Sequence, residues 1–516
     1  MSSKPLHFIA STFTALSHAR PMLGVVSTLL KDNPNLTFTI FAHKTFVGFV
    51  NDELGRSHLP PDVLAQRIRV IGVSQNEPKP SLEALKEIFF DLTTFVPEAY
   101  KIILQNGVVT CTTTSKQYDF KDLPKPTLFI CDMFSPLVGQ KIKEISPEIK
   151  LIHSFPPTVG SFIRHYGPAE LGGLGNWEAE TKAAMENGAR ASCKTFEQVA
   201  DSLHTEHPGE LQPNPEGVQL YDYEMHPQDV PQPPIVPILM ASTRQAVEWA
   251  DGSIMPSIDA FEPKSTQALQ RWYTDELHKR FFLVGPQLSV SPTSTTPPPP
   301  LPAEHPFSKV FTFLNSQPVK SVVLISFGTV FYPFTHPNQV EVLLKTLLET
   351  KTPFIFSRAS MGYAAAPLSK ELEDAVAASP ETALIADFCA MLTHGGAGST
   401  FEIIMYGVVG IFWPFAADQP VHAAYLTENL DAAFEVVQVR TGPGARPPRR
   451  GGQVVGTDEA IAAEIRQVVA DLKGEVGQRK RMNIEAVQRQ FLEAKTPGGS
   501  ADLALKALVE FGTPKE

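Results

Sequence analysis

Two strand-like segments flanking a helical pattern, at the start of the chain, most restrict the possible folds. Residues 6–11 and 36–42 are apolar and rich in β-branched and aromatic residues, as strands are. Residues 21–32 between them have the pattern of a helix opened by proline. A strand–helix–strand unit of this length predicts a crossover between parallel strands. The chain is therefore expected to begin with an α/β domain built on a parallel sheet.

The length of the chain and a proline-rich stretch predict two such domains. A chain of 516 residues exceeds one ordinary hydrophobic core. The clearest linker is 291–302 (SPTSTTPPPPLP), after which strand and helix patterns start again at 321–326. We expect an N-terminal domain over 1–285, a linker over 286–306, a C-terminal domain over 307–495 and a final helical segment over 496–516.

Charge and composition exclude several classes of function. The net charge of -11 disfavours a nucleic-acid partner, and the basic run at 446–450 (RPPRR) is expected to be a solvated loop. No stretch approaches the roughly 18–20 apolar residues of a membrane span, so no stable membrane anchor is expected. The four cysteines lack metal-ligand spacing, which predicts no metal site and favours a reducing, cytoplasmic location.

Three segments have the composition of ligand loops at the carboxyl ends of strands, where open α/β sheets bind their ligands. The first is the SFGT turn, 326–329. Gly328 allows close approach of the backbone, and Thr329 adds a hydroxyl beside free N–H groups, which suits a phosphate. The alternative is an ordinary turn after a strand.

The second segment is THGGAGSTFE, 393–402. His394 ends an apolar strand, Gly396 keeps the turn open, and Ser399 is expected where a helix begins, which favours an anion site. Glu402 has the spacing of a capping box with Ser399. Its carboxylate could instead accept hydrogen bonds from a vicinal diol such as a ribose.

The third segment is GIFWPFAADQP, 410–420. Asp418 and Gln419 follow a predicted buried strand, and an adjacent carboxylate and amide suit the binding of sugar hydroxyls. The alternative is a turn followed by a helix cap.

Together these segments resemble the donor-binding signature of the eukaryotic UDP-glycosyltransferases that act on small molecules. The resemblance implies an α/β GT-B fold, in which two Rossmann-like domains with parallel sheets face each other across a cleft, and in which the final helix packs back on the N-terminal domain. It implies that His394 and Ser399 hold the diphosphate, beside Gly396 and the Gly328–Thr329 turn. It further implies that Glu402 holds the ribose and that Asp418 and Gln419 hold the transferred sugar.

The N-terminal half adds a match to the same family. The loop SHARPM resembles the loop that carries the catalytic base, which makes His18 that base. The alternative is that His18, one of 14 histidines in the chain, simply lies at the start of a helix. Asp132, after a predicted strand, matches the aspartate that orients the histidine. A histidine near neutral pH with a carboxylate to fix its tautomer suits removal of a hydroxyl proton.

The resemblance implies inverting transfer of a sugar, by preference glucose, from a UDP-sugar to a hydroxyl of a small lipophilic acceptor, with no metal and no other cofactor. One alternative is a catalytically impaired member that binds a nucleotide sugar or another small molecule. A sugar-nucleotide epimerase is a further alternative, but the sequence lacks identifiable additional acid and base residues.

One segment departs from the family pattern. The predicted strands 383–388 and 391–394 are separated only by Cys389 and Ala390, whereas a parallel crossover needs a dozen residues or more. A two-residue connection permits only a hairpin, and Cys-Ala is poor turn chemistry for one, so a crossover segment is missing. By resemblance, the missing segment would carry the family's uridine-contacting Trp and Gln, and Phe388 is the one nearby aromatic. Either the short connection comes from a mispredicted or alternatively spliced exon, or the protein has lost normal donor binding.

Overall fold

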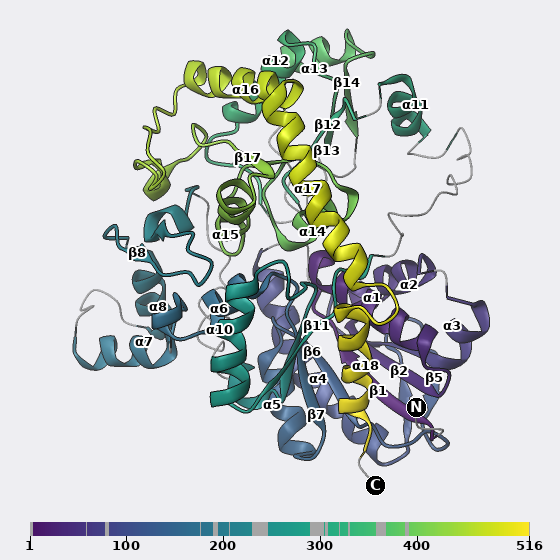
Figure 1. Cartoon of the computed structure of the whole chain (residues 1–516). Coiled ribbons are helices and arrows are strands. Elements are labelled where there is room, and N and C mark those ends of the chain that lie inside the picture. The colour runs from purple at the N-terminus through teal and green to yellow at the C-terminus, as the bar shows by residue number, and fades with distance from the viewer. Residues whose placement is uncertain are drawn as a thin grey trace.

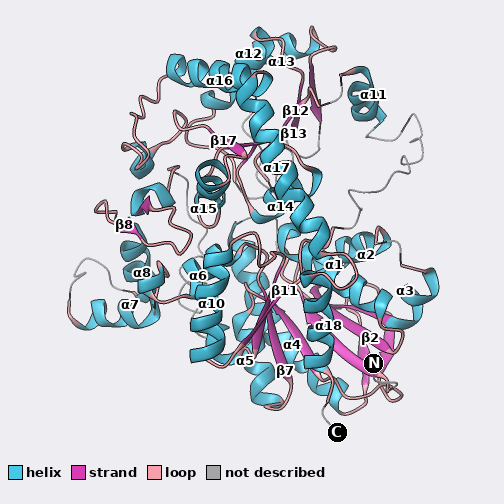
Figure 2. Cartoon of the chain, in the orientation of Figure 1, coloured by secondary structure: helices cyan, strands magenta, loops and turns pink. Residues whose placement is uncertain are grey.

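The computed structural model describes residues 4–57, 59–77, 82–175, 177–188, 195–205, 207–229, 246–288, 304, 308–318, 320–328, 331–357, 368–386 and 392–514. In these residues the strands form two large parallel sheets with helices packed around them (Figures 1 and 2). The first sheet belongs to the N-terminal half of the chain and the second to the C-terminal half. The expected α/β class with two parallel sheets is confirmed.

The first sheet has the strand order β11-β10-β7-β6-β1-β2-β3, and the second has the order β14-β13-β12-β15-β16-β17. In both sheets the chain starts at an inner strand, adds strands on one side and then crosses to the other side. The order therefore reverses between β1 and β6 and between β12 and β15. Ligands of open α/β sheets bind at such switch points, beyond the carboxyl ends of the strands.

The strands of the first sheet are β1 (Leu6–Ser11), β2 (Leu36–His43), β3 (Ile68–Val73), β6 (Leu128–Asp132), β7 (Lys150–Ser154), β10 (Gly252–Met255) and β11 (Arg280–Leu283). Those of the second are β12 (Val323–Ser326), β13 (Phe354–Ser357), β14 (Ala383–Ala386), β15 (Leu392–Thr393), β16 (Gly410–Phe412) and β17 (Ala433–Glu435). Two antiparallel pairs join β4 (Val108–Thr110) to β5 (Gln117–Asp119) and β8 (Leu211–Gln212) to β9 (Leu220–Tyr221).

The helices of the N-terminal half are α1 (Leu16–Asp32), α2 (Val47–Gly55), α3 (Pro61–Arg67), α4 (Leu82–Leu104), α5 (Pro136–Ile145), α6 (Val159–Tyr166), α7 (Trp177–Glu186), α8 (Phe196–Thr205) and α10 (Pro263–Leu269). Those of the C-terminal half are α11 (Ser308–Ser316), α12 (Asn338–Glu349), α13 (Lys370–Ala377), α14 (Ala397–Tyr406), α15 (Gln419–Ala424), α16 (Asp458–Lys473), α17 (Glu475–Ala494) and α18 (Ser500–Gly512).

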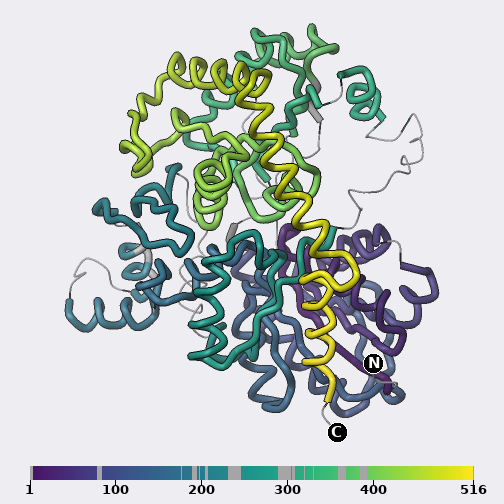
Figure 3. Tube along the Cα trace, viewed as in Figure 1, coloured from purple at the N-terminus to yellow at the C-terminus, as the bar shows by residue number. Residues whose placement is uncertain are grey.

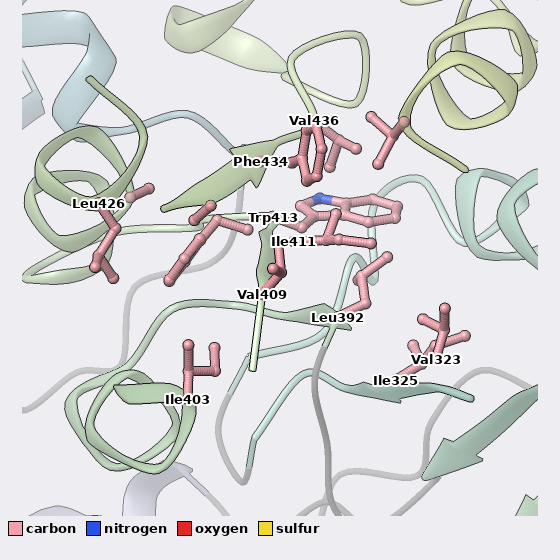
Figure 4. Close-up of a cluster of buried hydrophobic side chains, with 14 of the residues drawn as sticks. Val323, Ile325, Leu392, Ile403, Val409, Ile411, Trp413, Leu426, Phe434 and Val436 are labelled. Atoms are coloured by element: carbon pink, nitrogen blue, oxygen red, sulfur yellow. The ribbon is translucent and has the colours of Figure 1, made fainter. Parts of the chain in front are cut away.

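Both faces of the first sheet are buried, because alternate residues of each strand enter different cores. Phe8 of β1 packs with α1 and α18 on one face, whereas Ile9 packs with α4 and α5 on the other. This burial explains why β1 is apolar along its whole length. The second sheet has its own core, in which Val323, Leu392 and Trp413 lie together (Figure 4).

The end of the chain returns to the first sheet. Helix α17 runs from the C-terminal half toward the N-terminal half, and α18 lies against the N-terminal sheet (Figure 3). There Thr127 Oγ1 donates a hydrogen bond of 2.6 Å to the carbonyl of Gly512. The ring centroids of Phe511 and Phe282 are 5.7 Å apart. Helices α17 and α18 thus connect the two halves of the chain.

Two expectations about local structure are wrong. Helix α1 begins at Leu16 rather than at Pro21, so Pro21 lies inside the helix and His18 belongs to its first turn. Strands β14 and β15 do not form a hairpin. They pair in parallel with β13 and β12, which lie between them, and five residues, 387–391, separate the two strands instead of two. The register of the neighbouring strands decides this arrangement, and local apolar runs do not reveal it.

In the part of the chain that the structure describes, no helix is both long enough and apolar enough to cross a membrane.

Candidate functional site

A histidine and an aspartate meet at the switch point of the first sheet. His18 is the third residue of α1, which follows β1, and Asp132 is the last residue of the adjacent strand β6. His18 Nδ1 lies 3.1 Å from Asp132 Oδ1, and the carboxylate is completely buried. The two residues, 114 positions apart in sequence, are therefore brought together by the strand order.

The carboxylate determines which nitrogen of His18 is available. An ionised carboxylate only accepts hydrogen bonds, so Nδ1 of His18 carries the proton and Nε2 of the neutral ring has a free lone pair. The N–H of Phe134 donates to the same carboxylate oxygen at 2.8 Å, and the Phe134 ring packs on the His18 ring with 4.2 Å between centroids. These contacts fix the orientation that a general base requires.

The switch point of the second sheet brings the SFGT turn next to His394. Gly328 has a φ of 73°, and a Cβ on this residue would lie 2.5 Å from the His394 ring. A Cβ on Gly396 would also lie 2.5 Å from that ring. The two glycines therefore allow the backbone to enclose the imidazole. Thr329, the predicted phosphate contact, lies outside the described residues.

His394 is a neutral side chain at physiological pH. Burial is the main cause that lowers the pKa of His394 to about 4; the charge of Asp418 opposes this shift and nearby His422 adds to it. The ring can therefore offer a ligand a hydrogen bond rather than a full positive charge. Partial positive charge lies at the N-terminus of α14, because the first N–H groups of a helix lack partners within it.

The start of α14 excludes the capping-box interpretation of Ser399 and Glu402. The helix begins at Ala397 with Gly396 as its N-cap and without a side-chain cap, so Ser399 is already its third residue. The pKa of Glu402 is raised, mainly by burial. The charge of Arg20 opposes this shift, and that of Glu53 adds to it. Arg20 lies two residues after His18 on α1, and α1 contacts α14. The helix that carries His18 and the helix that carries Ser399 and Glu402 are therefore in contact across the two halves.

Asp418 and Gln419 lie at the start of α15, after β16. The Gln419 Oε1 accepts hydrogen bonds from the N–H groups of Phe415 at 2.9 Å and Ala416 at 3.3 Å, so the amide holds the preceding loop. Asp418 is the N-cap residue but makes no side-chain cap, and its Oδ2 lies 3.5 Å from His422 Nδ1. Ala417 just before them has a φ of 59°, which indicates a strained loop.

Sequence reasoning missed His422, which connects this loop to the N-terminal half. Its Nδ1 lies 2.9 Å from the carbonyl oxygen of Gly395, and its Nε2 lies 3.2 Å from Ser161 Oγ on α6. His422 is four residues after Asp418, a helical spacing that places both on one face of α15. That spacing was the available signal. The contact with Ser161 has no signal in the sequence.

A small cavity adjoins this contact. It is lined on the N-terminal side by Gly160, Arg164 and Met225 and on the C-terminal side by Val421. Most of its other lining residues are apolar. Within the described residues, no cluster of three or more His, Cys, Asp or Glu side chains could hold a metal ion.

No protein-family model matches the sequence. Curated relatives do match. A UDP-glycosyltransferase of Hericium erinaceus, eriJ, is 25% identical over 314 residues, which cover 57% of this chain and 60% of that protein. UDP-glycosyltransferase 72E3 of Arabidopsis thaliana is 24% identical over 456 residues, covering 81% and 89% of the two chains. Alignments with the first three relatives span 39–60% of those proteins' lengths.

Solved structures match over almost the whole chain. The UGT71G1 structure of Medicago truncatula with UDP-glucose has a TM-score of 0.66 at 18% identity and covers 99% of each chain. A UGT transferase of Siraitia grosvenorii with UDP has a TM-score of 0.68 at 15% identity and covers 98% of this chain and 99% of that one. At these identities the likeness establishes the fold.

Proposed function

The chain is related in sequence to the UDP-glycosyltransferases and shares their fold, and on that premise we propose that it transfers a sugar from a UDP-sugar to a hydroxyl of a small lipophilic acceptor. The observation that carries this proposal is the 3.1 Å contact between His18 Nδ1 and Asp132 Oδ1, because His18 lies on α1, a helix that contacts α14. This arrangement joins a general base to an anion site.

In this mechanism the Nε2 of His18 removes the proton from the acceptor hydroxyl as its oxygen attacks the anomeric carbon. Asp132 stabilises the imidazolium that forms. The UDP leaves from the opposite face, so the configuration at the anomeric carbon inverts. The N–H groups at the start of α14, with His394 and Ser399, stabilise the negative charge on the leaving diphosphate. No metal is required in this scheme.

The remaining roles rest on the resemblance to the family's donor-binding signature. Glu402, in the middle of α14, binds the ribose diol, and Asp418 and Gln419 bind hydroxyls of the transferred sugar, with glucose the preferred donor. The relatives that bear on this choice include a protein named anthocyanidin 3-O-glucosyltransferase, from Solanum melongena.

A transfer assay tests the proposal. Radiolabelled UDP-glucose and other UDP-sugars are incubated with the purified chain and a panel of phenols, terpenoids and sterols. We expect a labelled product with the wild type, and a rate about 10²–10⁴-fold lower with His18→Ala, the usual contribution of a general base. Product formation unaffected by this substitution would contradict the assigned base.

A second candidate function is an impaired, non-catalytic binder of nucleotide sugars. The observation in its favour is that five residues connect β14 to β15, where a crossover past two intervening strands normally takes a dozen or more. Absence of transfer with every UDP-sugar, together with retained UDP binding, would favour the binder. Sequencing the transcript would decide whether a longer segment is normally encoded here.

A further inference from the structure

His422 links three segments of the chain: α15, the loop after β15 and helix α6. It belongs to α15, which starts at the sugar-binding pair, and its ring contacts the loop after β15 through Nδ1 and helix α6 of the N-terminal half through Nε2. The ring is buried, with 1% of the side chain exposed. It therefore cannot reach a substrate and acts only through its neighbours.

The partners of His422 assign its protons. A carbonyl oxygen only accepts, so Nδ1 donates to Gly395, and Nε2 of the neutral ring accepts from the hydroxyl of Ser161. On the far side of Ser161, Thr158 Oγ1 lies 3.3 Å from Ser161 Oγ and 3.1 Å from Glu262 Oε1. A buried chain of hydrogen bonds thus runs from the N-terminal half into the loop after β15.

The bond to Gly395 determines the direction of the next N–H group. The Gly395 carbonyl is held by His422 Nδ1 at 2.9 Å and by Thr400 Oγ1 at 3.1 Å. Because the C=O and N–H of a trans peptide point in opposite directions, the N–H of Gly396 points away from both. No partner for this N–H is found among the described residues. Gly396 is the N-cap of α14, where the proposed diphosphate site lies.

We infer that His422 is a positioning residue for the donor diphosphate: it fixes the Gly395–Gly396 peptide so that the Gly396 N–H faces the ligand, and its contact with Ser161 couples this loop to the acceptor-side half. The inference rests on the proposed function. It assigns to the Gly395 contact the larger effect on donor affinity and to the Ser161 contact the smaller one.

Three substitutions separate the two contacts. His422→Ala removes both. His422→Asn keeps a donor near the position of Nδ1 and loses the reach to Ser161, whereas His422→Gln keeps the reach of Nε2 and loses the Nδ1 donor. His7→Ala is the matched control. The buried ring of His7, on β1, also contacts one carbonyl oxygen and one hydroxyl, those of Pro124 at 3.2 Å and of Thr39 at 2.9 Å.

Isothermal titration with UDP measures the effect, with the thermal midpoint as a check of folding. We expect His422→Ala and His422→Gln to raise the Kd for UDP about tenfold, the loss of one well-placed hydrogen bond. His422→Asn is expected within about threefold of the wild type, and Ser161→Ala is expected to raise the Kd about threefold. In transfer assays the KM for the UDP-sugar should rise more than kcat falls.

Several results would overturn the inference. A folded His422→Ala variant with wild-type Kd and KM would do so, as would His7→Ala weakening UDP binding to the same degree as His422→Ala. A His422→Asn variant as weak as His422→Ala would show that the Gly395 bond is not the cause. If the wild type itself neither binds UDP nor transfers sugar, the proposed function fails and this inference fails with it.

Discussion

At the scale of single residues, burial and contacts with neighbouring groups determine which side chains of the candidate site carry a proton. Asp132 is completely buried and fixes the His18 tautomer, and burial keeps His394 neutral. Glu262 is the opposite case. Burial is the main cause that raises the pKa of Glu262 to about 7; hydrogen bonds from Gly160 and Thr158 oppose this shift and nearby Glu216 adds to it.

Asp132→Asn tests the tautomer argument. An asparagine can present its amide N–H groups to Nδ1, which favours the tautomer with a proton on Nε2 and removes the base. We expect kcat to fall by about 10²–10⁴-fold. UDP affinity, measured by titration, should stay near the wild-type value because Asp132 lies in the N-terminal half. A kcat within threefold of the wild type would contradict the tautomer argument.

Glu262→Gln tests the buried carboxyl. A folded-state pKa above the ordinary value of 4.5 means that the group stabilises the fold at low pH and that this contribution is lost as pH rises from about 4.5 to 7. Relative to Glu262→Gln, the wild type should therefore lose stability between pH 5 and pH 8, by on the order of 1–3 kcal/mol.

Urea unfolding of both proteins at pH 5, 6.5 and 8 gives this difference. Buried His7 and His153, whose pKa values burial lowers to about 4, change stability in the opposite direction, with loss as pH falls below about 6.5. Both histidines are present in the two proteins, so their effect cancels. A difference that is constant with pH would contradict a raised pKa for Glu262.

At the scale of elements, the switch points explain how distant residues meet. His18 and Asp132 follow the neighbouring strands β1 and β6, and Gly328 and His394 follow the neighbouring strands β12 and β15. The loop after β12 and the loop before α14 each need a glycine, because the His394 ring occupies the space beside Gly328 and Gly396.

A pair of glycine substitutions in one loop tests this packing. Gly396→Ala places a methyl group 2.5 Å from His394 Nε2, so we expect UDP affinity to fall by tenfold or more, about 1.4 kcal/mol. Gly398→Ala is the control, since a Cβ there meets nothing within 4 Å and alanine favours the helix. Its UDP affinity should be retained and its thermal midpoint slightly raised. Equal affinities in the two variants would contradict the packing argument.

Much of this level could be predicted from sequence. The apolar runs at 6–11, 36–42 and 321–326 match β1, β2 and β12 to within two residues, because buried parallel strands are continuously apolar, whereas β3, β10, β11 and β17 were not predicted. The start of α1 was wrong because proline at position 21 is tolerated inside that helix. The sequence did not show that β13 and β12 lie between β14 and β15, because strand order depends on the whole sheet.

At the scale of the whole molecule, a buried ion network joins the two halves. Arg440 lies 3.0 Å from Glu224, which precedes the linker, and 2.8 Å from Glu435 at the end of β17. The basic run 446–450 is exposed except at Pro448, as expected of a solvated loop, and it also contacts this network. The Arg446 guanidinium lies 3.9 Å from the ring centroid of Tyr223, and Arg450 pairs with Glu435 at 3.1 Å. Sequence shows the charges but not partners more than 200 residues away.

Arg440→Ala tests the importance of this network for the joined fold. The substitution leaves two buried carboxylates without their shared cation, and we expect the free energy of unfolding to fall by about 3–5 kcal/mol. Arg466→Ala is the control, because its pair with Glu349 is exposed on both sides and should contribute little. Urea unfolding measures both. A loss for Arg440→Ala no larger than for Arg466→Ala would contradict a structural role of the network.

The central claim is that the carboxyl edge of the second sheet, at the start of α14, binds a nucleoside diphosphate. The most direct measurement is calorimetric titration of the folded wild-type chain with UDP, beside His394→Ala. The account predicts one UDP per chain and an affinity at least about tenfold weaker in the variant, the cost of one lost hydrogen bond to a charged ligand. No detectable binding of UDP to the folded wild type would contradict it.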